Sequence, residues 1–267
     1  MEPLRQFWHT LGTAMHKLLP VLALSLGLCA TPPGADPLEP INLLERAQWR
    51  AIGAVNFAGF RTLVQCSGTL IAPDLVLTAA HCASDAEGRT GAPNSRHFIA
   101  GLFLDEFVAD SRSIDIRVHP AYAIARDEAK FRYDIAVIQL ANPMPPELVV
   151  PLPIATGITT LPGPFGIVAY NRFRPFVLAG RFDCERSNRQ DALDLRMSCT
   201  VVSGNSGAPV LARIDDTLKV VAVTVASIRE IDSRQALAVP IVDWVLEEQR
   251  RAVTRARERA ASDAANQ

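Results

Sequence analysis

The sequence has no excess of charge of either sign. Its 267 residues carry 27 basic and 28 acidic side chains, which gives a formal net charge of −1. Binding of nucleic acid without sequence preference depends on a basic surface, so this charge balance argues against that class of function. Charged residues make up 21% and hydrophobic residues 49%, which excludes an intrinsically disordered chain. A chain of this length is expected to form one or two domains, each with a buried core.

Periodic repeats and long apolar spans are also missing. The 15 glycines and 19 prolines follow no fixed period, which excludes collagen-like and repeat architectures. The apolar run at residues 18–28 is short for a membrane-spanning helix, which needs about 20 residues. We therefore expect a soluble globular protein, without nucleic acid and without a stable membrane partner.

That short apolar run has the features of an export signal. Arg5 and Lys17 precede it, and Cys29, Ala30 and a Thr-Pro-Pro-Gly segment follow it. A basic start, a short apolar stretch and small residues beyond it are typical of a secretory signal peptide. We predict a signal peptide at residues 1–30, with a retained anchor or a buried helix as alternatives. The protein is accordingly expected to be secreted or periplasmic.

The cysteine count becomes even once Cys29 leaves with the signal peptide. Cys66, Cys82, Cys184 and Cys199 remain, and four cysteines allow three disulfide connectivities. The spacings favour the local pairs Cys66–Cys82 and Cys184–Cys199, each closing a loop of about 15 residues that contributes on the order of 3 kcal/mol. A zinc site would need Cys-x-x-Cys or paired histidines, and the sequence has neither. We expect no metal and no organic cofactor.

The body of the chain contains many short apolar runs and no long helical period between them. The runs are rich in valine, isoleucine and leucine, are broken by Gly, Pro, Asn and Asp, and lie at residues 68–72, 75–78, 114–118, 135–140, 208–212 and 220–225. Such spacing predicts an all-β barrel or sandwich.

Three other segments divide the chain. Residues 31–45 are predicted to be a Pro-rich linker or pro-segment, because residues 31–40 cannot form a regular element. The Pro-rich stretch 142–153 separates two predicted halves, residues 46–145 and 146–238. Residues 239–267 are predicted to form a C-terminal helix and tail, with Pro240 in the first turn and the arginines of residues 250–259 on a solvated face.

Three segments hold the residue types that serine-based hydrolysis needs. They read LIAPDLVLTAAHC at residues 70–82, YDIAVIQL at 133–140 and CTVVSGNSGAPV at 199–210. A serine hydroxyl needs an imidazole as its base, and the imidazole needs a carboxylate to hold the right tautomer. His81, Asp134 and Ser206 supply these groups. Their order differs from that of α/β-hydrolases, and Ala208 replaces the second glycine of the Gly-x-Ser-x-Gly elbow.

Other histidines and aspartates fit the pattern less well. His97 and His119 lack a distinctive setting and are interpreted as structural. Asp115 alternates with apolar residues in a predicted strand, so its side chain should face solvent. Asp127 lies in a charged loop, whereas Asp134 starts an apolar strand and should be buried.

Together the three segments resemble trypsin/chymotrypsin-like serine proteases over roughly residues 50–245. The Leu-Thr-Ala-Ala-His-Cys sequence is the most specific match, and Gly-Asn-Ser-Gly resembles the bacterial glutamyl-endopeptidase branch. The resemblance implies an all-β fold of two antiparallel six-stranded barrels, with the active site in the cleft between them, and a C-terminal α-helix. It also implies that a Cys66–Cys82 disulfide holds the strand end that presents His81.

The resemblance further implies an exported enzyme that needs no cofactor, in which Ser206 attacks, His81 acts as base and acid, and Asp134 orients His81. The backbone N–H groups of Gly204 and Ser206 would form the oxyanion hole. The expected protein is a monomeric serine endopeptidase that acts on protein or peptide substrates. A catalytically silent homologue that works as a binding module and a serine esterase are the alternatives.

The family's specificity pocket corresponds here to Thr200 and Val201 before the serine and to residues 223–227 after it, with Thr224, Val225 and Ala226 on the later strand. Thr200 places no carboxylate at the base of the pocket, and Thr224 stands where the glutamyl-endopeptidase branch has a histidine. An uncharged pocket would desolvate a charged side chain without pairing it. We therefore predict a preference for small or medium apolar side chains before the cleaved bond.

The residue before the serine also departs from the digestive enzymes of the family. Those enzymes have an aspartate there, which pairs with a newly freed N-terminal amine. Asn205 is neutral and cannot form that ion pair. Formation of the oxyanion hole is therefore predicted to be independent of a new chain terminus.

Overall fold

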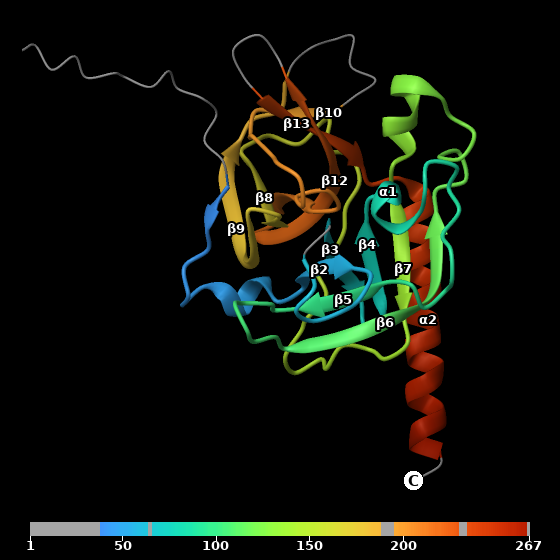
Figure 1. Cartoon of the computed structure of the whole chain (residues 1–267). Helices are drawn as coiled ribbons and strands as arrows, with labels where there is room; N and C mark the ends of the chain where they lie inside the picture. Colours follow the sequence, from blue (N-terminus) through green and yellow to red (C-terminus); the bar gives the residue numbers. More distant parts are fainter. Residues whose placement is uncertain (1–37, 64–65, 188–194, 230–233, 266–267) are drawn as a thin grey trace, which may run out of the picture. The chain divides into compact units, whose positions relative to one another are not determined.

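The structure is a computed structural model that describes residues 38–63, 66–187, 195–229 and 234–265. The predicted signal peptide at residues 1–30 lies outside these ranges. The described chain is mostly β and contains a closed barrel, a second sheet and a C-terminal helix (Figure 1). None of the helices in the described ranges combines the length and the apolar character needed to cross a membrane.

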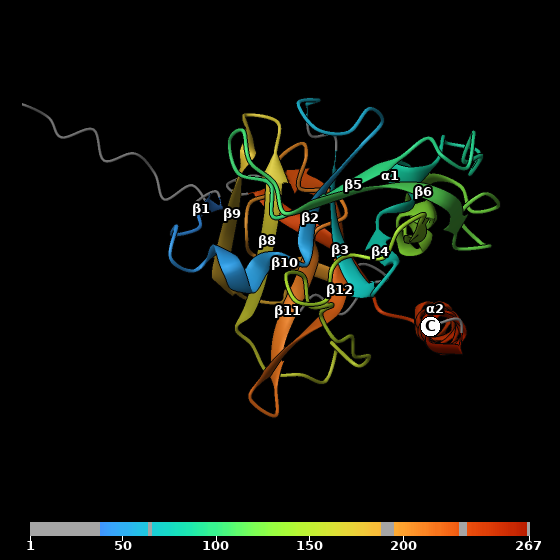
Figure 2. The same ribbon diagram turned by 90° about the horizontal axis from the view of Figure 1, so that it is seen from below.

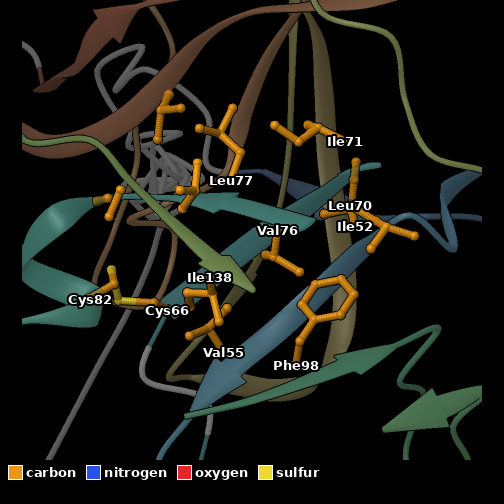
Figure 3. Close-up of a cluster of buried hydrophobic side chains, with 14 of the residues drawn as sticks. Ile52, Val55, Cys66, Leu70, Ile71, Val76, Leu77, Cys82, Phe98 and Ile138 are labelled. Carbon is orange, nitrogen blue, oxygen red and sulfur yellow. A yellow bond between two sulfur atoms is a disulfide. The ribbon is translucent and has the colours of Figure 1, made fainter. Parts of the chain in front are cut away.

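The first half of the chain forms a closed antiparallel barrel with the strand order β2-β3-β4-β7-β6-β5. Its strands are β2 (Ile52–Asn56), β3 (Cys66–Ala72), β4 (Leu75–Thr78), β5 (His97–Ala100), β6 (Ala109–Val118) and β7 (Ala136–Leu140). Four of the predicted apolar runs become β3, β4, β6 and β7, because each places aliphatic side chains inside the barrel, whereas β2 and β5 were not among the predicted runs. Ile52, Leu70, Phe98 and Ile138 are fully buried there (Figure 3).

The second half forms a seven-stranded antiparallel sheet with the order β1-β9-β8-β11-β12-β13-β10. Its strands are β1 (Glu39–Pro40), β8 (Phe165–Asn171), β9 (Arg174–Cys184), β10 (Leu195–Met197), β11 (Pro209–Ile214), β12 (Thr217–Arg229) and β13 (Arg234–Pro240). A separate cluster of buried side chains, which includes Phe165, Ile167, Met197 and Val210, forms the core of this half.

The expectation of two closed six-stranded barrels is correct for the first half and wrong for the second. One edge of β9 pairs with the added strand β1. The three-residue strand β10 pairs with β13 on one side, and on its other side it forms an isolated bridge between Met197 and Arg186, beyond the end of β9. Backbone hydrogen bonds of 2.9 Å from Ser187 to Arg196 and 2.8 Å from Ser198 to Glu185 flank that bridge. The seam therefore has too few paired residues to form a continuous ladder.

The expectation that residues 31–40 form no regular element is also wrong where the structure describes them. Glu39 and Pro40 form β1, which pairs with β9 (Figure 2). Leu38 and Ile41 on either side are buried. Proline is tolerated here because β1 is an edge strand, where a missing N–H breaks no ladder. The segment therefore pairs with β9 because the apolar residues that flank β1, Leu38 and Ile41, are buried.

The C-terminal helix α2 spans Asp243–Ala265 and is seen end-on in Figure 2. It starts later than predicted, because Pro240 ends β13 and pairs with Ala222 of β12. Its arginines are not simply solvated. Arg255 contacts the Gln139 side chain of β7, and Arg259 lies 3.6 Å from the buried carboxylate of Asp74.

A buried glutamate connects this helix to the barrel, and we expect its loss to destabilise the fold. Glu248 is 2% exposed and forms ion pairs with Arg117 of β6 and, at 3.0 Å, with Arg251. Glu248→Gln removes the negative charge that pairs with both arginines. The free energy of unfolding should therefore fall by about 2 kcal/mol. Urea unfolding measures this change.

Glu247→Gln is the matched control for that variant. Glu247 also pairs with Arg251, but about half of its side chain is exposed, so its loss should change the free energy of unfolding by about 0.5 kcal/mol or less. Equal destabilisation by the two variants would contradict the role given to the buried carboxylate.

Candidate active site

His81 and Asp134 come from segments next to two neighbouring strands of the barrel and meet directly. His81 lies in the short helix α1 (Ala80–Ala83), which follows β4, and Asp134 lies between the 3₁₀ helix η2 (Asp127–Tyr133) and β7. The Asp134 Oδ2 atom is 2.7 Å from His81 Nδ1, and its Oδ1 atom accepts the His81 backbone N–H at 2.9 Å. Pairing of β4 with β7 brings the two elements together.

This contact determines which nitrogen of the imidazole is free. A carboxylate oxygen is only an acceptor, so the Nδ1 atom of His81 must carry the hydrogen of the 2.7 Å bond. In the neutral ring Nε2 then has the lone pair. The Asp134 side chain is 5% exposed and the His81 side chain is 38% exposed. The buried carboxylate therefore holds a partly exposed imidazole, whose Nε2 atom lies 3.7 Å from Cys82 Sγ.

Asp127 lines a hollow together with His81 and Asp134, whereas the other rival candidates lie elsewhere. Asp115 is exposed, as predicted, and pairs with Arg117. Asp127 is in η2 with a positive φ of 51°. His97 pairs with Asp110 at 3.0 Å on β5 and β6. His119 stacks on Tyr133, and burial lowers its pKa.

Ser206 lies on the loop between β10 and β11, held close to the first barrel. Its backbone carbonyl accepts the N–H of Ser67 at 2.7 Å, and its hydroxyl donates to the Val225 carbonyl at 3.4 Å. Val225 lines a hollow of about 270 Å³ together with His81 and Asp134. Ser206 is thus linked to this hollow through Val225, and among the described residues it forms no direct hydrogen bond with His81. Hydrogen bonds between such groups often tighten only when substrate binds.

Two glycines fix the course of this loop. Gly204 and Gly207 have φ angles of +98° and +82°, which favour glycine. A Cβ atom on Gly204 would lie 2.8 Å from the backbone of Asn171, and one on Gly207 would lie 2.1 Å from the Ser67 carbonyl oxygen. Within the described ranges, the N–H groups of Gly204 and Ser206 donate to no other group. They remain available to an outside acceptor.

Asn205 uses both ends of its amide inside the protein. Its side chain is buried, its Oδ1 accepts the Val202 N–H at 2.7 Å, and its Nδ2 donates to the Tyr170 carbonyl at 2.7 Å. The loop before Ser206 is therefore held by neutral hydrogen bonds to the main chain.

The hollow beside His81 has both neutral and charged residues in its wall, because Asp127 and Lys130 line it as well as Tyr122 and Phe131. Tyr122 lines it and is buried. Burial raises the pKa of Tyr122 to about 12, and the charges of Asp134 and Asp85 act in the same direction. The phenol therefore stays protonated at ordinary pH and adds no charge beside the imidazole.

The residues predicted for the specificity pocket lie near the Ser206 loop. Val201, Thr224 and Val225 are buried, and Thr200 and Ala226 are half-buried. The loop is tied to this strand, because the Gly207 N–H donates to the Thr224 carbonyl at 2.7 Å. All five side chains are uncharged.

Both disulfides favoured by the cysteine spacing are present. Cys66 bonds to Cys82, and Cys184 bonds to Cys199 (Figure 3 shows the first pair). Cys66 is the first residue of β3, and Cys82 follows His81 in α1, so the first disulfide secures the turn that carries the imidazole. The two sulfur atoms lie close to His81. They are bonded to each other, so they are not thiolate ligands for a metal.

Sequence reasoning missed two residues that position the serine loop. Ser67 donates through its hydroxyl to the Gly204 carbonyl at 3.0 Å, and the Tyr170 N–H donates to that hydroxyl at 2.9 Å. Ser67 belongs to the Cys-Ser-Gly-Thr segment beside a predicted disulfide, which was a usable signal. Tyr170 lies in an ordinary apolar strand, and nothing in its local sequence marks it.

Comparison with known proteins places these features in a known family. Residues 66–223, more than half of the chain, match the family model described as a trypsin-like peptidase domain. The finer resemblance to the glutamyl-endopeptidase branch stays a prediction.

Two curated relatives match a smaller region. The chain is similar to Serine protease Hayan of Drosophila melanogaster, with 33% identity over 105 residues, which is 37% of this chain and 15% of that protein. It is also similar to Limulus clotting factor C of Carcinoscorpius rotundicauda, with 31% identity over 105 residues, which is 36% of this chain and 10% of that protein. The matched region thus spans a small part of each relative.

Proposed function

The chain belongs to the trypsin-like peptidase domain family, and we propose that it is a serine endopeptidase with Ser206, His81 and Asp134 as its catalytic residues. The observation that carries this proposal is the bond between the buried Asp134 carboxylate and His81 Nδ1. That bond leaves Nε2 of His81 free to act as a base. His81 lines a hollow together with Val225, and the Val225 carbonyl accepts the Ser206 hydroxyl.

The chemistry follows from these groups. The Ser206 Oγ atom attacks the substrate carbonyl carbon while His81 Nε2 takes the hydroxyl proton. Collapse of the tetrahedral intermediate breaks the C–N bond, and His81 returns the proton to the leaving amine. Water then attacks the acyl-enzyme ester with His81 again as base, which releases the acid product and restores Ser206. Asp134 stays ionised and stabilises the imidazolium.

We assign the oxyanion hole to the backbone N–H groups of Gly204 and Ser206. Both are free donors within the described ranges, and the positive φ of Gly204 sets the direction of its peptide. Donors of this kind stabilise the negative charge that develops on the carbonyl oxygen, and losing one typically costs about 10²- to 10³-fold in rate.

The Asn205 contacts support an oxyanion hole that needs no new N-terminus. Replacing Asn205 with Asp exchanges the donor that faces the Tyr170 carbonyl for a second acceptor. Two acceptors in a buried site repel, and the cost of about 1–3 kcal/mol should lower kcat about 10- to 100-fold. Steady-state hydrolysis of a peptide substrate measures the change.

Asn171→Asp is the matched control for this substitution. Asn171 is also buried, but its Oδ1 only accepts, from the N–H groups of Phe173 and Arg174. An aspartate keeps that role, so kcat should change little. An Asn205→Asp enzyme as active as the Asn171→Asp enzyme, or an activity that depends more than about tenfold on a free amine in a chain starting at Thr31, would contradict the proposed positioning.

The substrate preference is proposed from the uncharged residues Thr200, Val201, Thr224, Val225 and Ala226. We expect kcat/KM to be highest for peptides with Ala, Val or Leu before the cleaved bond and lower for matched peptides with Arg or Glu. A charged side chain would lose its hydration there without gaining an ionic partner, which costs several kcal/mol. A peptide-library cleavage profile tests this ranking. Arg or Glu as the best substrate would contradict it and leave the catalytic residues unaffected.

Export is proposed on two grounds. The sequence pattern at residues 1–30 is typical of a signal peptide, and the two disulfides fit an oxidising compartment. Cell fractionation of the producing organism, with mass spectrometry of the mature N-terminus, tests both localisation and the cleavage position.

A further inference from the structure

A second hollow, partly open to solvent, lies away from the His81 hollow. It is a cavity of about 200 Å³ between the 3₁₀ helix η1 (Arg46–Trp49), the turn that follows β5, and strands β8 and β9. We call it the Arg46 cavity, and the residues that define it are Arg46, Trp49, Arg50, Leu102, Tyr170 and Leu178. In Figure 2 the η1 segment is the blue coil near β9. The cavity is not part of the proposed catalytic machinery.

The polar groups of the Arg46 cavity are mainly donors. Trp49 lines this cavity and also stacks on Phe182 beside another hollow; it is 4% exposed, and its Nε1 atom is buried without a hydrogen-bond partner among the described residues. The Nε atom of Arg46 is buried in the same way, while its guanidinium lies 3.6 Å from the centre of the Phe103 ring. Indole and guanidinium groups cannot accept hydrogen bonds, and leaving buried donors unpaired is costly. A ligand that satisfies them must bring acceptors.

The charge around the cavity also favours a ligand that brings hydrogen-bond acceptors. Arg46 and Arg50 are half-buried, whereas the one acidic lining residue, Glu106, is exposed. In the described chain neither arginine forms an ion pair. A guanidinium matches the two oxygens of a carboxylate with two parallel hydrogen bonds. One negative charge on the ligand therefore suits the site.

The size and the remaining walls define the rest of the ligand. Leu102, Val108 and Leu178 give the cavity an apolar side. An apolar protein cavity of about 150 Å³ holds benzene. A cavity of about 200 Å³ therefore has room for one ring or one branched chain attached to a carboxylate.

Tyr170 connects this cavity to the loop that carries Ser206. Its hydroxyl donates to the Leu102 carbonyl at 2.9 Å on the cavity side, and its backbone carbonyl accepts Asn205 Nδ2 at 2.7 Å on the other. Burial raises the pKa of Tyr170, and the charge of Arg46 acts in the opposite direction, which places Arg46 within electrostatic reach of the phenol. A ligand on Arg46 would contact the residue that fixes the serine loop.

We propose that the Arg46 cavity binds a small monocarboxylate with one aromatic ring or branched aliphatic chain, and that the bound ligand stabilises the Ser206 loop through Tyr170. The regulatory meaning of this site rests on the proposed hydrolase function, but the binding and the stabilisation do not.

Phenylacetate is the probe for this proposal, and neutral phenylacetamide is its matched control. Isothermal calorimetry on the full chain carrying Ser206→Ala should show saturable phenylacetate binding, with phenylacetamide about tenfold weaker or worse. Arg46→Gln should weaken phenylacetate binding about tenfold, and Trp49→Phe, which keeps the ring but removes the donor, should also weaken it. Arg250→Gln, on the exposed face of α2, should leave the affinity unchanged.

Hydrogen exchange tests the connection to the serine loop. Saturating phenylacetate should slow amide exchange of a peptide covering residues 199–210 about fivefold, and this effect should disappear in Arg46→Gln. Equal binding of phenylacetate and phenylacetamide, or unchanged affinity in folded Arg46→Gln, would overturn the site. Binding without any change in exchange at residues 199–210 would overturn the stabilisation. Both readouts are independent of catalysis, so they remain informative if the hydrolase proposal fails.

Discussion

Replacing Asp134 with Asn should lower kcat about 10⁴-fold with little change in the fold. The amide oxygen can still accept the His81 backbone N–H, which Asp134 Oδ1 accepts at 2.9 Å. The amide nitrogen then faces His81 Nδ1 as a donor, so the imidazole must place its hydrogen on Nε2. That tautomer cannot take the Ser206 proton. Pre-steady-state and steady-state hydrolysis of one peptide substrate measures the loss.

Asp110→Asn provides a matched control elsewhere in the same barrel. Asp110 also contacts a histidine, His97, at 3.0 Å through Nδ1, but that pair lies between β5 and β6. Activity should stay within about threefold of the unmodified protein, since the substitution touches no reacting group. Similar losses in the two variants would show that Asp134 acts on stability and not on the His81 tautomer.

The largest loss of activity is expected for Ser206→Ala, about 10⁶-fold in kcat. The hydroxyl is the only group in the proposal that forms a covalent bond to the substrate. The fold should tolerate the change, because the loop is held through the Ser206 carbonyl and the Asn205 side chain, both of which remain. Hydrolysis measured at high enzyme concentration gives the residual rate.

Ser203→Ala is the control in the same loop. Ser203 is exposed, and its backbone carbonyl, which the substitution keeps, accepts the Arg172 N–H at 3.0 Å. The enzyme should keep nearly full activity. A Ser206→Ala protein that retains more than about a hundredth of the activity would contradict the assignment of the nucleophile.

The barrel and the contact between His81 and Asp134 were predictable because their signals are local. Short runs of β-branched and aliphatic residues became strands, and the pairing of β4 with β7 put His81 beside Asp134 as the two segments implied. Alternation also placed Asp115 in solvent correctly. The cysteine spacing favoured the two disulfides that form, because each closes a short loop between neighbouring elements.

The remaining features depend on contacts between residues far apart in the sequence. The second sheet does not close, because β10 pairs with the segment after β9 only through an isolated bridge among the described residues. The strand at Glu39 forms because its neighbours Leu38 and Ile41 are buried against the second half. The hydrogen bond from Asn205 to Tyr170 joins residues that are 35 positions apart in the sequence, and no local pattern predicts such a pair.

Covalent labelling of Ser206 with a fluorophosphonate tests the central claim most directly. The native protein should take up one adduct per chain, and peptide mapping should locate it on Ser206. Labelling should be lost on denaturation and should fall sharply in His81→Ala, because the reagent needs a serine activated by a neighbouring base. A folded native protein that stays unlabelled, or that carries its adduct on another residue, would contradict the account and favour a catalytically silent binding module.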